Sequence, residues 1–101
     1  MTCAVRFTRE AEDDLLRLID FLIAQDLTAA RHAQEAITEA IKFLTIFPFS
    51  CRKAEGNSGN PFLRELLIPF GNAGYVALFE IEDANTVTIL AVRHQREEDY
   101  H

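Results

Sequence analysis

The chain has 101 residues, of which 49% are hydrophobic and 26% charged, with only three Pro and four Gly. This composition is typical of one globular domain around a single core, here residues 1–101, and it argues against disorder. The net charge of −6, from 10 basic and 16 acidic residues, disfavours direct nucleic-acid binding, because phosphate-binding domains usually carry surplus Lys and Arg.

No apolar stretch approaches the roughly 18 residues that a membrane-spanning helix needs. The first residues lack the basic region and apolar core of a secretory signal, so we expect a cytoplasmic protein. Cys3 and Cys51 match no metal or redox spacing. The two thiols could pair if the fold brought them together, but without an export signal we expect them to be free, and we expect no metal and no cofactor.

The N-terminal half predicts one strand and one helix before a short turn. Cys3 to Phe7 is rich in β-forming residues and indicates a first strand. Thr8 is a suitable N-cap, and acidic residues follow it near the positive end of the predicted helix. Apolar residues then recur at helical spacing until the helix ends near Gln25, and Asp26-Leu27 form a turn.

A second helix follows this turn, with Thr28 as its expected N-cap. Its apolar stripe consists of small residues early and larger ones late, which allows the two helices to approach closely as an antiparallel hairpin. Phe47-Pro48 ends the helix, because Pro cannot continue it and restrains the preceding residue. Ser50 to Pro61 is then rich in Ser, Gly, Asn and Lys and predicts a surface loop.

Three further strands are expected in the C-terminal half, and the short turns between them predict an antiparallel meander. The strands are Phe62 to Ile68, Tyr75 to Ile81 and Thr86 to Val92, with Pro69–Gly74 and Glu82–Asn85 as the turns. The element order is β-α-α-β-β-β, an α+β fold in which the helical hairpin packs on a small, mainly antiparallel sheet. The N-terminal strand is expected either at an edge of the sheet or between other strands.

The last predicted strand passes directly into a densely charged tail, Arg93-His94-Gln95-Arg96-Glu97-Glu98-Asp99-Tyr100. These residue types can contact phosphate, transfer a proton or bind a partner protein. Tyr100 lies close to the end of the chain, where side chains are often frayed, and this weakens a catalytic role for it.

Short sequence motifs distributed over nearly the whole chain resemble those of the RelE/ParE superfamily of type II toxin–antitoxin toxins. Each motif alone is weak evidence for the resemblance, but their order and spacing together are specific to the superfamily. They are Phe7–Leu15, Ala40-Ile41 to Phe47-Pro48, Leu63–Leu66, Phe70-Gly71, Gly74–Phe79 and Ile89–Glu97.

The resemblance implies a bacterial toxin, associated with growth arrest and plasmid stabilisation. It also implies a cognate antitoxin that lays a flexible C-terminal segment over the groove between helices and sheet. RelE-like members cleave messenger RNA on the ribosome, whereas ParE-like members inhibit DNA gyrase without catalysis of their own.

A ribosome-dependent nuclease needs a general base, a general acid and cations close together. The candidates for these roles are Arg64, His94 and Tyr100. The acidic balance and the scarcity of Lys instead favour the ParE-like branch, in which the target is a protein. A toxin-like fold that only binds its antitoxin is a third alternative.

The surfaces expected to bind the target are the helical hairpin and the tail from Arg93 to Tyr100. The individual residues expected to bind target or antitoxin lie on the last three strands and the tail. Arg64 has a second interpretation as a cation paired with Glu65 or another carboxylate, and the aromatic residues have one as sheet core or groove lining. The expected binding residues are Arg64, Tyr75, Phe79, Arg93, His94, Arg96 and Tyr100.

Overall fold

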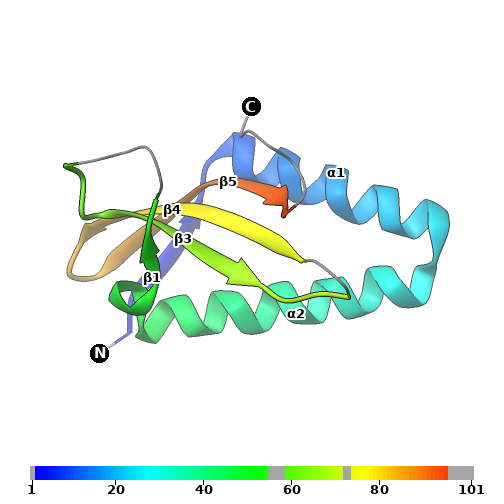
Figure 1. Cartoon of the computed structure of the whole chain (residues 1–101), viewed down its shortest axis with the longest axis horizontal. Helices are drawn as coiled ribbons and strands as arrows, with labels where there is room; N and C mark the ends of the chain where they lie inside the picture. The colour runs from blue at the N-terminus through cyan, green and yellow to red at the C-terminus, as the bar shows by residue number, and fades with distance from the viewer. Residues whose placement is uncertain (1, 55–58, 72–73, 96–101) are drawn as a thin grey trace.

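The computed structural model describes residues 2–54, 59–71 and 74–95, so the expectations for Arg96 and Tyr100 lie outside the described residues. Two helices and a five-stranded sheet make up the fold (Figure 1). The elements are β1 (Ala4–Phe7), α1 (Arg9–Gln25), α2 (Leu27–Ile46), the 3-10 turn η1 (Pro48–Ser50), β2 (Arg52–Lys53), β3 (Leu63–Ile68), β4 (Tyr75–Asp83) and β5 (Thr86–His94).

The sheet has the strand order β1-β5-β4-β3-β2, with β1 parallel to β5 and every other pair antiparallel. The predicted α+β order and the mainly antiparallel sheet are therefore confirmed. The sequence left open where the first strand lies, and the structure places it at an edge of the sheet.

Thr8 caps α1 as expected, because its hydroxyl oxygen accepts a hydrogen bond from the Ala11 amide at 3.1 Å. The prediction that Thr28 caps α2 is wrong. Asp26 caps it instead, with Oδ1 accepting from the amides of Thr28 at 2.9 Å and Ala29 at 3.4 Å. The Asp26 amide also donates to the Leu22 carbonyl, so this one residue both ends α1 and begins α2.

The antiparallel helical hairpin packs one face against the sheet and extends past the strand ends on the right of Figure 1. The core lies between hairpin and sheet, where the small residues Ala11 and Ala33 are fully buried and permit close approach of the helices. From the strands the core takes alternate residues, which are Leu66 and Ile68 on β3, Tyr75, Ala77, Phe79 and Ile81 on β4, and Val87, Ile89 and Val92 on β5.

A β-bulge at Leu90 reverses the alternation along β5. Leu78 is opposite Ala91 and Phe79 is opposite Ile89, which leaves Leu90 as an extra residue. Val87 and Ile89 face the core before the bulge, and Val92 faces it afterwards. The bulge therefore directs His94 to the helix side of the sheet and Arg93 to the opposite side.

Two short elements were not expected from the sequence. Within the stretch taken as a loop, Pro48–Ser50 forms η1 and Arg52–Lys53 forms β2, which pairs with β3. The strands β4 and β5 are also longer than predicted. The turn between them is reduced to Ala84 and Asn85, closed by a bond from the Asn85 amide to Asp83 Oδ1 at 2.8 Å.

Candidate protein-binding surfaces

At the end of β5, the ring of His94 lies in a row of aromatic side chains. The rings of Tyr75 and His94 form a T-shaped pair with their centroids 5.8 Å apart. The Phe70 ring stacks on the Tyr75 ring with a centroid separation of 5.6 Å. Burial raises the pKa of the Tyr75 hydroxyl, so this side chain remains neutral at physiological pH. His94 itself is partly exposed.

Arg93 is partly exposed on the other side of the strand from His94. Its Nη1 donates to the carbonyl oxygens of His94 at 3.2 Å and Gln95 at 3.4 Å. These bonds hold the guanidinium against the backbone where the described part of the chain ends.

Arg64 binds backbone carbonyl oxygens instead of the carboxylate that the sequence suggested. Its Nη1 donates to Phe49 at 2.9 Å and to Cys51 at 2.8 Å, and its Nε donates to Pro61 at 2.8 Å. The guanidinium also lies over the Phe49 ring, 5.2 Å from the centroid. Arg64 thus fastens the segment from η1 to β2 onto β3.

The carboxylate of Glu65 pairs with Arg52, at 3.1 Å from Nη2 and 3.2 Å from Nε. Glu65 is 6% exposed, and a buried carboxylate requires such a charge-assisted partner. The neighbouring strand β2 thus supplies the cation for Glu65. The alternative that Arg64 is a structural cation fits its contacts, although these are to backbone carbonyls and not to Glu65 or another carboxylate.

The sheet register separates Arg64 from His94. Arg64 is opposite Phe79 on β4, whereas His94 is opposite Tyr75, which in turn is opposite Ile68 on β3. Two strand spacings and four residues along the strands correspond to about 16 Å between their Cα atoms. Arg64 and His94 do not share one site in this arrangement.

Tyr75 and Phe79 lie inside the molecule, with 2% and 0% of their surfaces exposed. Both belong to the core between sheet and helices. This position fits the interpretation as sheet core and leaves neither residue a surface for direct contact with a partner.

A groove of about 400 Å³ lies between α2 and β3. Apolar residues form most of it, and Glu39 is the one charged residue among the described residues that line it. Its lining is Ala36, Glu39, Ala40, Phe43, Leu66, Leu67 and Pro69. β2 covers β3 only opposite Arg64 and Glu65, so the edge of β3 beside this groove has no neighbouring strand among the described residues.

A second hollow, of about 350 Å³, lies between the two helices. Leu15, Leu16 and Ile19 line it from α1, and Gln34, Ile37 and Thr38 line it from α2. Large apolar side chains farther along the hairpin are also exposed, namely Phe21, Ile23 and Leu27. The hairpin therefore presents apolar surface beyond what its packing on the sheet uses.

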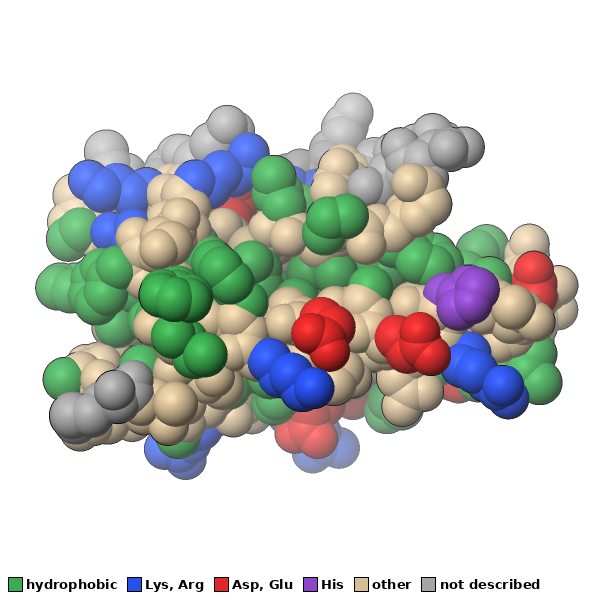
Figure 2. All heavy atoms as spheres, turned by 90° about the horizontal axis from the view of Figure 1, so that it is seen from below, with side chains coloured by type: hydrophobic (Ala, Val, Ile, Leu, Met, Phe, Trp, Pro, Cys, Tyr) green, Lys and Arg blue, Asp and Glu red, His purple; other side chains and the backbone are tan. Residues whose placement is uncertain are grey.

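Exposed aromatic residues gather where α2 ends. Phe43 and Phe47 have ring centroids 5.5 Å apart, and Phe49 meets Phe62 edge-on at 6.3 Å. Figure 2, which looks onto the α2 side, shows hydrophobic side chains collected over its left part and charged side chains spread along α2 to the right.

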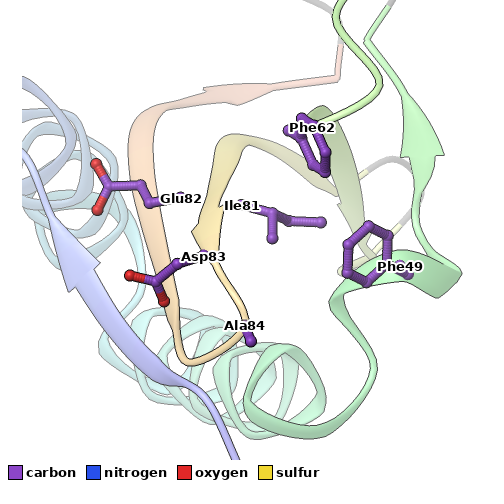
Figure 3. Close-up of a pocket in the computed structure, with 6 residues that line it drawn as sticks. All are labelled: Phe49, Phe62, Ile81, Glu82, Asp83 and Ala84. Carbon is purple, nitrogen blue, oxygen red and sulfur yellow. The ribbon is translucent and has the colours of Figure 1, made fainter.

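Phe49 and Phe62 form the walls of a hollow of about 340 Å³ next to the β4–β5 turn. Figure 3 shows the Ile81 side chain directed toward the space between the two rings, whereas the carboxylates of Glu82 and Asp83 are directed away from them. The hollow is thus an apolar surface with acidic groups at its margin.

The sequence analysis did not identify this aromatic surface. The available signal was the run Phe47-Pro48-Phe49, in which two large aromatic residues flank a helix-ending Pro. Residues at such a junction have few neighbours to cover them, so two Phe there indicate exposed apolar surface.

Among the described residues, no three His, Cys, Asp or Glu side chains are grouped so as to hold a metal ion. Cys3 and Cys51 are free thiols, as expected. No described helix is both long and apolar enough to cross a membrane.

Comparison with known proteins gives consistent results. The family model described as the ParE toxin of the type II toxin–antitoxin system parDE matches residues 5–99. Toxin RelE1 of Caulobacter vibrioides is 33% identical over 81 residues, which cover 80% of this chain and 82% of that protein. A chain from the chromosomal ParDE system of P. aeruginosa has the same fold, with a TM-score of 0.68 at 21% identity over 92% of this chain and 96% of that one.

Proposed function

Because the chain belongs to the ParE toxin family of type II toxin–antitoxin systems, we propose that it inhibits DNA gyrase by binding and that a cognate antitoxin neutralises it. The observation that most favours binding over catalysis is the position of Arg64. Its guanidinium is held by three backbone carbonyls and lies far from His94 in the sheet register. The net charge of −6 also favours a protein over a phosphate-rich target.

A supercoiling assay with purified gyrase and relaxed plasmid tests the target. We expect the toxin to reduce supercoiling or to trap a cleavage complex, and the toxin premixed with its antitoxin to do neither. Full supercoiling and no trapped complex at a large excess of toxin would exclude gyrase as the target.

The groove between α2 and β3 is the surface that we assign to the antitoxin. It is largely apolar, and the adjacent edge of β3 offers backbone groups to an extended segment. A flexible antitoxin segment can place apolar side chains in the groove while its backbone pairs with that edge.

Two exposed apolar residues allow a matched test of this assignment. Leu67 lines the groove and is 45% exposed, whereas Ile23 lies on α1 outside the groove and is 50% exposed. We expect Leu67→Asp to weaken antitoxin binding at least tenfold and Ile23→Asp to change it less than twofold, measured by calorimetry. Equal effects of the two substitutions would argue against this groove.

The ribosome-dependent nuclease is the second candidate, and the partly exposed His94 beside Tyr75 is the observation in its favour. Message cleavage in a translation extract, lost in His94→Ala and retained in Arg64→Lys, would support a nuclease centred on His94. Absence of cleavage by the wild-type protein would leave binding as the mechanism.

A further inference from the structure

Within the described part of the chain, the second half of β5 has no strand on its outer side. β1 ends at Phe7, opposite Ile89, while β5 continues to His94. An uncovered strand end of this kind normally leaves backbone groups without protein partners. Residues from the start of α1 occupy this place instead.

Thr8 and Asp14 supply the bonds that the missing strand would make. The Thr8 amide donates to the Ile89 carbonyl at 3.0 Å, and the Thr8 hydroxyl donates to the Leu90 carbonyl at 3.1 Å. The Val92 amide then donates to Asp14 Oδ2 at 2.9 Å. These bonds extend over the bulge at Leu90, where the strand would otherwise be least constrained.

Asp14 is 5% exposed, although it is a charged residue on a helix that offers exposed positions at either side of it. A carboxylate is buried at a cost unless it accepts strong hydrogen bonds. Asp14 belongs to the Phe7–Leu15 motif that carries part of the family resemblance. The proposed function gives this motif no role. The burial of Asp14 is explained by its bond to the Val92 amide.

We propose that Asp14, with Thr8, is a positioning residue that fixes the end of β5, and thereby the orientation of Arg93 and His94, for engagement of the target. The proposal rests on the proposed inhibition of gyrase, and it assigns to the target the end of β5, where the sequence leads us to expect that Arg93 and His94 bind a partner. Arg93 and His94 are the first residues after Val92, so loss of the bond to Val92 transmits directly to them. Without the bond, the strand end fluctuates and binding must order it, which weakens the complex.

Four variants separate this role from ordinary stabilisation. Asp14→Ala removes the acceptor, and Asp14→Asn keeps an oxygen that accepts from Val92. Asp14→Glu keeps the charge but displaces it by one methylene group, and serves if Asp14→Ala does not fold. Asp13→Ala is the matched control, since Asp13 is an exposed Asp on the same helix.

Amide hydrogen exchange of the free protein is the first measurement. We expect the Val92 amide to exchange at least tenfold faster in Asp14→Ala and Asp14→Glu, while the Val87 and Ile89 amides are unchanged. Asp14→Asn and Asp13→Ala should resemble the wild type. An unchanged Val92 amide, or equal acceleration along the whole of β5, would overturn the proposal.

Inhibition of gyrase and binding of the antitoxin are measured on the same variants. We expect Asp14→Ala to inhibit at least tenfold more weakly with antitoxin affinity within twofold of wild type, and Asp14→Asn to restore inhibition. Parallel losses of both activities, or full inhibition by Asp14→Ala, would overturn the positioning role. A wild-type protein that does not inhibit gyrase would instead refute the proposed target, and hydrogen exchange would still decide whether Asp14 holds the strand.

Discussion

Single residues with unusual surroundings hold the strand ends together. Gly74 has a positive φ of 119°, and a Cβ at this position would run into the Ile68 carbonyl oxygen. Its own carbonyl accepts from the Gln95 amide at 2.9 Å. Gly74 thus lies between the last residue of β3 and the residue that follows β5, and only Gly fits there.

Gly74→Ala is expected to destabilise the fold by about 2–3 kcal/mol, because it adds a steric clash to the strain of a positive φ. Gly71 is the control, since its φ of 60° is also positive but a Cβ there meets no atom within 4 Å. Gly71→Ala should cost only about 1 kcal/mol. Urea denaturation measures both values, and equal costs would contradict the close approach at Gly74.

Arg64→Lys should destabilise the protein by about 2–3 kcal/mol despite keeping the charge, because an ammonium cannot reproduce the guanidinium bonds to separate carbonyls. Lys53→Ala is a suitable control, since Lys53 is an exposed cation on the adjacent strand. If Arg64→Lys left the urea midpoint unchanged while abolishing inhibition of the target, Arg64 would be a contact residue and not a structural one.

At the scale of elements, the junction of the two helices depends on one side chain. Asp26 both ends α1 and caps α2. Asp26→Ala is therefore expected to lower stability by about 1–2 kcal/mol, whereas Thr28→Ala should be nearly neutral. Thermal unfolding followed by circular dichroism measures both, and the reverse order would indicate that Thr28 is the effective cap.

Helical periodicity and short turns were sufficient to predict both helices and the meander. They could not predict the bulge at Leu90, because an extra residue in a strand changes which side chains face the core without changing the local composition. Likewise β2 consists of only two residues, and Arg64 bonds to Phe49 and Cys51 in the segment that leads into it. Those contacts are formed only in the folded chain.

Part of the candidate site could also be predicted from the sequence. The position of His94 at the end of the last strand follows from the sequence, since the β-forming run stops there. The surroundings of Arg64 do not follow, because its carbonyl partners on Phe49 and Cys51 lie in a segment that reads as a loop. The apolar groove beside β3 also depends on how α2 crosses the sheet, which local patterns do not specify.

At the scale of the whole molecule, two ionisable core groups couple stability to alkaline pH. Burial raises the pKa of the Cys51 thiol, with Arg64 partly offsetting it, and burial also raises the pKa of the Tyr75 hydroxyl. Above about pH 8.5 for Cys and about pH 10 for Tyr, the unfolded chain loses these protons before the folded one does. Stability should therefore fall as the pH rises through this range.

Urea midpoints at pH 7, 9 and 10 test this expectation. Cys51→Ala should reduce the slope of stability against pH between 7 and 9, whatever the substitution does to stability itself. Cys3→Ala, which removes the other thiol, is the control. An identical slope in all three proteins would show that the Cys51 thiol does not contribute.

The parallel pairing of β1 with β5 joins residues 4–7 to residues 86–89. The complete sheet can therefore form only after nearly the whole chain has been synthesised and has left the ribosome, because its first strand pairs with its last. The surface at the end of β5 does not exist on any shorter nascent chain. A toxin of a type II toxin–antitoxin system that is built in this order completes the surface at the end of β5 only when its own translation is nearly finished.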